Sequence, residues 1–209
     1  MPVARRRPST MSRVEGTPER QRLMGLVVDL ILRDGVIDTS LSAIARAIGS
    51  NNRMLLYYFG SKQDLIDEAS LVAFESFPRL RDMFARLHAP GDLEERLLTA
   101  WDDLADPDSR PYVRLFFQRF GIAMRDPDEW EDFTERVGRE WIEEVETALL
   151  GEGFTPADAL TAATQVIALW RGLQFLLLAG VSPEQVRASY RAAVVDLLRR
   201  EGAAGFPAR

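Results

Sequence analysis

Apolar residues along this chain recur at three- and four-residue spacing, which is the period of an amphipathic α-helix. The first such run consists of Leu23, Leu26, Val27, Leu30 and Ile31. No stretch alternates apolar and polar residues at period two with β-branched enrichment, so no strand is predicted. The pattern therefore predicts an all-α protein of about nine helices.

Capping residues and helix breakers separate these runs. The residues predicted to cap the first four helices are Thr17, Ser40, Ser50 or Asn51, and Ser61. Gly35, Gly49 and Gly60 are expected to end the first three helices, and Pro78 is expected to kink or end the fourth. Proline follows a cap residue again at Asp126-Pro127, Thr155-Pro156 and Ser182-Pro183, where later helices are expected to begin.

The composition narrows the function classes. The chain has 209 residues, 46% of them hydrophobic and 28% charged, which is typical of a globular protein. It has no cysteine and one histidine, His88, so we expect no cofactor, no metal site and no enzyme activity. The N-terminus lacks the apolar run of a secretory signal, and the apolar stretch near residues 166–178 is interrupted by Arg171 and Gln174. We therefore expect a cytoplasmic protein without a membrane span.

Charge is distributed unevenly. Residues 1–62 carry a net charge of +5, and residues 63–209 carry −11. A basic N-terminal segment followed by an acidic body (residues 63–209) indicates an anionic partner at one end of the chain, although chance clustering of tail arginines remains an alternative. By composition the chain divides into a basic tail that is predicted to be disordered (1–16), a helical segment (17–62) and a longer acidic helical segment (63–209).

Residues 40–66 have the pattern of a helix-turn-helix, in which a packed first helix supports a second helix that enters the DNA major groove. Ile44, Ala45 and Ile48 would bury the first helix, and Gly49 would permit the turn. Asparagine pairs with adenine, arginine pairs with guanine, and hydroxyl or ammonium donors bind phosphates. The candidate DNA-contacting residues are Ser40, Ser50, Asn51, Asn52, Arg53, Met54, Tyr57, Tyr58 and Lys62, the last being the only lysine. An ordinary helical hairpin with polar surface residues is the alternative.

This segment resembles the DNA-binding domain of the TetR family of transcriptional regulators. The resemblance covers about residues 20–66 and rests on Ile31, Gly35, Ser40, Leu41, Ile44, Ala45, Gly49, Leu55, Tyr57, Phe59, Ser61, Lys62 and Leu65. The sequence departs from the family pattern at residues 50–54, which read Ser-Asn-Asn-Arg-Met, and at Leu56, where an aromatic residue is usual. The resemblance implies that residues 17–62 are a DNA-binding domain and residues 63–209 a ligand-sensing and dimerisation domain, in a homodimer that binds a palindromic operator and releases it when a small ligand enters the second domain. The arginines of the tail either enter a DNA minor groove or are simply solvated.

The acidic body is rich in aromatic residues, which form either a core or a ligand cavity between helices. The candidate ligand-contacting residues are Trp101, Phe116, Phe117, Arg119, Phe120, Met124, Trp141, Trp170, Arg171 and Gln174. Arg119 and Arg171 lie in apolar faces, where each needs either an internal or dimer salt bridge or an acidic or carbonyl-bearing effector.

The last two helices are predicted to form a homodimer interface, with packing inside one chain as the rival interpretation. The apolar residues behind this prediction are Ala162, Ala163, Val166, Leu169, Trp170, Leu173, Val186, Tyr190, Ala193, Val194, Leu197 and Leu198.

Together these features predict a ligand-responsive DNA-binding transcriptional regulator. The expected partners are double-stranded DNA, a small-molecule effector and a second copy of the chain. A repressor released from its operator by a small, largely apolar effector fits best, and the sequence does not separate a repressor from an activator. The alternative is a helical small-molecule-binding protein or enzyme with an incidental helix-turn-helix.

Overall fold

A computed structural model describes residues 16–35, 39–125 and 131–205, and all regular secondary structure within these ranges is helical. The predicted all-α class is therefore confirmed. The chain forms two compact units, one ending at Ala73 and the other beginning at Phe74. This division falls inside α4 (Lys62–Glu75), whereas the sequence analysis placed the domain boundary at the start of that helix.

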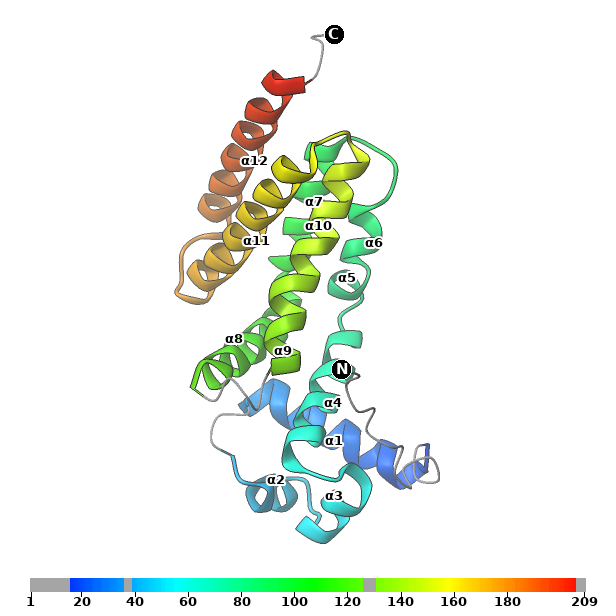
Figure 1. The fold of residues 1–209 in the computed structure, drawn as a ribbon. Coiled ribbons are helices and arrows are strands. Elements are labelled where there is room, and N and C mark those ends of the chain that lie inside the picture. Colours follow the sequence, from blue (N-terminus) through cyan, green and yellow to red (C-terminus); the bar gives the residue numbers. More distant parts are fainter. Residues whose placement is uncertain (1–15, 36–38, 126–130, 206–209) are drawn as a thin grey trace, which may run out of the picture. The chain divides into compact units, whose positions relative to one another are not determined.

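Unit 1 consists of α1 (Pro18–Asp34), α2 (Leu41–Ala47), α3 (Asn52–Phe59) and most of α4 (Figure 1). Thr17, Ser40, Asn51 and Ser61 each accept a hydrogen bond from the backbone N–H three residues further on. Such caps satisfy donors that the first turn of a helix leaves unpaired. Of the two predicted caps for α3, Asn51 performs this role.

Unit 2 contains the remaining helices, and its elements include several short helices that the sequence pattern did not separate. They are α5 (Pro78–Arg81), α6 (Met83–Leu87), α7 (Leu93–Leu104), the 3₁₀ helix η2 (Pro107–Ser109), α8 (Arg110–Arg125), α9 (Glu131–Glu135), the π-helical turn η4 (Arg136–Glu140), α10 (Trp141–Gly151), α11 (Pro156–Leu178) and α12 (Pro183–Gly205). The described residues thus hold more helices than the nine expected. As predicted, α4 ends before Pro78. The predicted cap at Asp126 lies outside the described residues.

In unit 2, α11 packs against α10, α12 and α7 (Figure 1). Trp170 of α11 and Tyr190 of α12 are fully buried, and the Trp170 Nε1–H donates to the Tyr190 hydroxyl at 2.9 Å. Tyr190 in turn donates to the Leu97 carbonyl at 3.3 Å, which joins three helices through one buried hydroxyl. Burial raises the pKa of Tyr190, so the hydroxyl stays neutral and able to donate.

Most of the apolar residues proposed for the dimer interface belong to this internal core instead. Unit 2 itself buries Ala162, Ala163, Val166, Trp170, Leu173, Val186, Tyr190, Val194 and Leu197. The rival interpretation, packing inside one chain, therefore accounts for these side chains. The reason is that these side chains pack in the core that α11 and α12 form with α7 and α10, so they are not available to a second copy of the chain.

Helix α11 is longer than the apolar stretch read from the sequence. With 23 residues and a mean hydropathy of 1.2 over its most apolar window, it has the length and composition to cross a membrane. The core helix of a globular domain meets the same criterion. Trp170 and Val166 of α11 are completely buried within unit 2, which explains the apolar composition as core packing.

Candidate functional site

The turn between α2 and α3 fixes the orientation of α3. Gly49 has φ of +67°, a conformation that side-chain-bearing residues rarely adopt. This allows the Ser50 N–H to donate to the Ala45 carbonyl at 2.7 Å, which closes the C-terminus of α2. On the far side of the turn, Leu55 and Phe59 are buried to 1% exposure. The opposite face of α3 is consequently exposed to solvent.

The candidate base-reading residues at the start of α3 differ in the partners they already have. Asn51 Oδ1 accepts from the Met54 N–H at 3.0 Å, so this side chain caps the helix. Asn52 Nδ2 donates to Ser42 Oγ at 2.7 Å and ties α3 to α2. Arg53 is exposed and has no hydrogen-bond partner among the described residues. Its guanidinium is therefore the group at this end of α3 that is available to an outside partner.

Four further candidate residues lie on the surface of unit 1 near helix ends. Tyr57 is 65% exposed, and its ring contacts Tyr58 edge-on with a centroid distance of 5.0 Å. Lys62 is exposed at the first position of α4, and Ser40 is exposed as the cap of α2. Hydroxyl and ammonium donors at helix N-termini have the chemistry that binds phosphate oxygens. Ser50 directly precedes the Asn51 cap, and Met54 lies three residues after it. Both residues are half-buried.

Arg20 holds the C-terminal end of α3, a role that sequence reasoning missed. Its Nε donates to the Tyr58 carbonyl at 3.4 Å, and its Nη2 pairs with Glu68 Oε2 at 2.6 Å. The guanidinium carbon lies 4.9 Å from the centroid of the Phe59 ring. Arg20 therefore joins α1, α3 and α4. No local sequence signal shows this, because the three partners lie at least 38 residues from Arg20. The tail arginines Arg5, Arg6, Arg7 and Arg13 lie outside the described residues.

In unit 2, four residues predicted to contact a ligand come together at what we call the Arg171 site. The Arg171 guanidinium carbon lies 4.0 Å from the Trp141 ring centroid and 4.3 Å from that of Phe116. Arg171 Nη1 donates to Gln174 Oε1 at 3.3 Å. The residue as a whole is half-buried, but its Nη2 is shielded from solvent and has no hydrogen-bond partner. Burial lowers the pKa of Arg171 to about 10, so it remains charged at neutral pH.

The other candidate ligand residues are distributed between core and surface. Trp101 and Trp170 lie in the core of unit 2, and each has at most 1% of its surface exposed. The remaining candidates, all on α8, are half-buried Phe117, buried Arg119, and exposed Phe120 and Met124. The Arg119 guanidinium carbon lies 4.3 Å from the Phe133 ring centroid. The Phe116 ring contacts the rings of Phe117 and Phe120, which extends the aromatic surface beside Arg171.

A pocket of about 260 Å³ opens where the end of α7, η2 and α8 meet the turn between α11 and α12. Its lining residues are Leu104, Ala105, Asp106, Pro107, Arg110, Val113, Gln174, Leu177, Leu178, Gly180, Val181, Ser182 and Pro183. Only Gln174 belonged to the sequence-predicted set. The breaks at Asp106-Pro107 and Ser182-Pro183 were predicted, but their meeting in space depends on the packing of α7 against α11 and α12.

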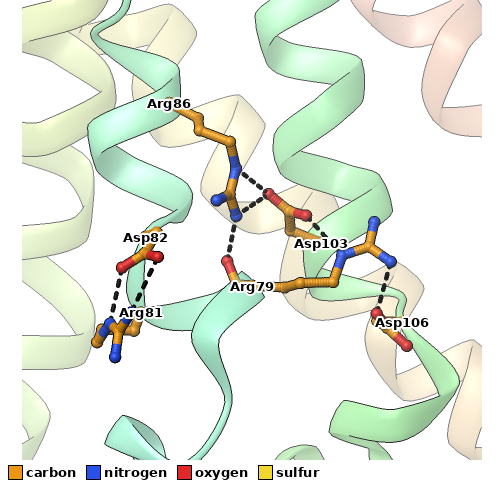
Figure 2. Close-up of polar contacts among 6 residues, drawn as sticks. All are labelled: Arg79, Arg81, Asp82, Arg86, Asp103 and Asp106. Carbon is orange, nitrogen blue, oxygen red and sulfur yellow. Dashed lines mark hydrogen bonds and ion pairs between the residues drawn. The ribbon is translucent and has the colours of Figure 1, made fainter.

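Beside the pocket lies what we call the Asp103 cluster: Arg79, Arg86, Asp103 and Asp106 (Figure 2). Asp103 has a side chain only 4% exposed, and it accepts from Arg79 Nε at 3.0 Å and from Arg86 Nε at 2.9 Å. Arg79 Nη1 also pairs with the pocket residue Asp106 at 2.6 Å. The hydrogen bond to Asp103 is the main reason that the pKa of Arg79 is raised. The cluster anchors α5 and α6, which directly follow α4, to α7 and η2.

Residues 28–69 match the family model described as bacterial regulatory proteins, tetR family. No curated protein matches. A transcriptional regulator from Rhodococcus sp. Rha1 has a similar solved structure, with a TM-score of 0.71, 16% identity, and coverage of 87% of this chain and 96% of that one. A second regulator, of the TetR family and also from Rhodococcus sp., has a TM-score of 0.70 and 18% identity over 87% of this chain and all of that one.

The multidrug binding protein EbrR, complexed with imidazole, is 23% identical with a TM-score of 0.65, over 93% of this chain and 97% of that one. These structures share the fold over 87–93% of this chain, and the family model matches part of its N-terminal unit. The predicted TetR-family resemblance is thus confirmed: residues 28–69 match the model of that family, and the solved structures similar to this chain include a TetR-family transcriptional regulator.

Proposed function

We propose that this protein is a homodimeric, cytoplasmic repressor that binds a palindromic operator through α3 and releases it when a small molecule binds unit 2. The observation that carries the proposal is the fixed presentation of α3. Gly49 and the buried Leu55 and Phe59 hold this helix so that Arg53 and Tyr57 face solvent. In a helix-turn-helix, this is the helix that enters the major groove.

The partners of the α3 side chains support a ranking of their DNA contacts. Arg53 is the strongest candidate for reading a base, because a guanidinium without an internal partner can pair with O6 and N7 of guanine. Asn52 must exchange its bond to Ser42 before both ends of its amide can contact adenine. Asn51 serves as the cap of α3, so we assign it a positioning role. Tyr57, Tyr58 and Lys62 are assigned to backbone phosphates.

Fluorescence anisotropy with duplexes taken from the DNA that flanks the coding region of this protein tests this assignment. Arg53→Ala should weaken binding to the preferred palindrome by about 1–3 kcal/mol and alter the sequence that is selected. Lys62→Ala should weaken binding to every duplex and reduce the slope of affinity against salt by about one unit. Arg22→Ala is the matched control and should bind as wild type, because Arg22 is exposed on α1 and pairs with Glu19 of the same helix. Wild-type protein that binds no duplex at low salt contradicts the proposal.

The outer faces of α11 and α12 support the proposed dimer. Small residues repeat there at four-residue spacing, namely Ala168 and Gly172 on α11 and Ala188 and Ala192 on α12. All four are exposed, and residues four apart lie on one face of a helix. Small side chains let helix backbones approach closely, so two copies would form a four-helix bundle across these faces.

Gly172 offers a direct test of this interface. A Cβ built at Gly172 meets nothing within 4 Å, so a larger side chain fits the single chain. We expect Gly172→Leu to fold but to shift the protein to monomer in analytical ultracentrifugation and to abolish operator binding. Gly121→Leu on α8, where a Cβ also meets nothing within 4 Å, is the matched control and should remain dimeric. A Gly172→Leu protein that stays dimeric places the interface elsewhere.

The effector site is assigned to the pocket and the adjoining Arg171 site in unit 2. The similar fold of EbrR holds imidazole in its crystal structure, which supports a small organic effector here. To release DNA, the effector must bind the dimer state with wrongly spaced recognition helices more tightly than the DNA-bound state. A coupling of about 1–3 kcal/mol would change operator affinity roughly 5–150-fold. Ligand binding with no effect on operator affinity would favour the alternative of a small-molecule-binding protein.

A further inference from the structure

Resting on the proposed effector site, we propose that the effector is a small organic carboxylate whose acid group pairs with Arg171 and whose apolar body occupies the pocket. The surroundings of the Arg171 guanidinium favour this class of effector. A buried charge normally has an ion-pair partner, because desolvation otherwise makes it unfavourable. Arg171 instead has two aromatic rings and one amide oxygen, and none of the described residues pairs a carboxylate with it.

Other arginines of unit 2 show that carboxylates are available where structure requires them. Arg79 and Arg86 share Asp103, Arg96 pairs with Glu152, and Arg187 pairs with Asp102. For Arg171, as for Arg119, the sequence predicted either an internal or dimer salt bridge or an acidic or carbonyl-bearing effector. The structure leaves the Arg171 Nη2 buried and without an acceptor. An acceptor brought by a ligand would complete this site.

Gln174 connects this guanidinium to the pocket. Its side chain lines the pocket, and its Oε1 accepts the bond from Arg171 Nη1. At 3.3 Å this bond is long for an N–H···O hydrogen bond and does not involve a charged acceptor. A carboxylate entering past Gln174 would replace a neutral acceptor by a charged one, which forms the stronger hydrogen bond and can bind a guanidinium through both oxygens.

The charges around the pocket favour an anion over a cation. Asp106 lines the pocket, but its carboxylate is already paired with Arg79. Arg110 also lines the pocket, is exposed, and has no ion-pair partner in the part of the chain that the structure describes. The net charge offered to a ligand is therefore positive. In addition, Arg171 already occupies the faces of Trp141 and Phe116, where a cationic ligand would stack.

The volume of the pocket and its lining residues indicate the size and the polarity of the rest of the ligand. A volume of about 260 Å³ is below the range of roughly 300–1,000 Å³ for drug-sized ligands. Leu104, Val113, Leu177, Leu178 and Val181 supply the apolar wall. The pocket and the Arg171 site thus match a molecule with one acid group on a compact apolar body.

Three probes with one apolar body and different head groups test the proposal: 4-phenylbutyrate, 4-phenylbutan-1-ol and 4-phenylbutylamine. Each is titrated into the full-length protein without DNA by isothermal titration calorimetry. We expect the carboxylate to bind at least tenfold more tightly than the alcohol and the amine. Arg171→Met should reduce carboxylate affinity at least tenfold and leave alcohol affinity unchanged. Arg114→Met, an exposed arginine of α8 outside the pocket lining, should bind all probes as wild type.

Several outcomes overturn the proposal. Tighter binding of the amine than of the carboxylate, no carboxylate binding at millimolar concentration, or full carboxylate affinity in Arg171→Met would each do so. Loss of binding in Arg110→Gln but not in Arg171→Met assigns the anion to the pocket mouth and also overturns it. These titrations use no DNA, so failure of operator binding removes the proposed function without deciding the effector class. A folded Arg171→Met protein is verified by its thermal unfolding transition.

Discussion

Two sites in unit 2 surround arginine guanidinium groups with different kinds of partner. In the Asp103 cluster, a buried carboxylate accepts hydrogen bonds from both Arg79 and Arg86, whose side chains remain 56% and 40% exposed (Figure 2). At the Arg171 site, a shielded guanidinium has Trp141 and Phe116 as its main neighbours and no carboxylate partner in the described part of the chain. The anion is thus buried and fully paired in the first site, while the cation is shielded and incompletely paired in the second.

The difference contrasts arginines whose charge is balanced within unit 2 with one whose charge the proposed effector would balance. The Asp103 cluster satisfies its own hydrogen bonds, so it contributes to the stability of unit 2 without any ligand. The Arg171 site leaves a donor unsatisfied, which reduces stability until something else provides an acceptor. Binding sites often carry such a stability deficit, because the groups that recognise a ligand are poorly satisfied in its absence.

The largest change in stability is expected from removing Asp103, the carboxylate that Arg79 and Arg86 share. Asp103→Ala leaves Arg79 and Arg86 without their common acceptor and opens a small buried space. Removing one partner of a fully buried ion pair costs about 3–5 kcal/mol, but both arginines are substantially exposed, so we expect about 2 kcal/mol. For a chain of this size, this corresponds to a fall in Tm of about 4–8 °C, measured by calorimetry. A change in Tm below about 1 °C would mean that the cluster is not structural.

Much of unit 1 was predictable from sequence because its signals are local. Thr17, Ser40 and Ser61 were identified as caps from their spacing to the following helix, and each accepts the expected backbone N–H. Gly49 was assigned to the turn because a positive φ favours glycine, and it has φ of +67°. The Asn52–Ser42 bond was not predictable in the same way. It depends on the distance between two helices, and the sequence alone does not provide that distance.

Unit 2 was less predictable because its site is built from distant segments. The aromatic residues and Arg171 lie in one region of the sequence, where their pattern is typical of both a core and a ligand cavity. The structure puts Trp101 and Trp170 in the core, while Trp141 and Phe116 face Arg171. The Asp103 cluster was also missed, since its pairs are 17 to 27 residues apart and follow no motif.

A smaller change in stability, of opposite sign, is expected from a substitution at the Arg171 site. Arg171→Met keeps a long apolar side chain against Trp141 and Phe116 and removes the incompletely paired charge. It loses a cation–π interaction of about 0.5–2 kcal/mol but also removes an unsatisfied buried donor that costs about 1–3 kcal/mol. We expect a net gain of about 1 kcal/mol, or about 2–4 °C in Tm, without ligand. A clear loss of stability would make Arg171 a structural residue and would end the contrast with Asp103.

The smallest effect is expected from an arginine that belongs to neither site. Arg81 lies next to the Asp103 cluster and pairs with the adjacent Asp82, with Arg81 Nε at 2.7 Å from Asp82 Oδ1 (Figure 2). That hydrogen bond raises the pKa of Arg81 and lowers the pKa of Asp82, yet both side chains are exposed and screened by solvent. We therefore expect Arg81→Ala to leave the Tm unchanged at physiological salt, in the same scans as Asp103→Ala. A decrease comparable to that of Asp103→Ala would show that any loss of an arginine from α5, rather than the burial of the shared anion, determines the stability of this region.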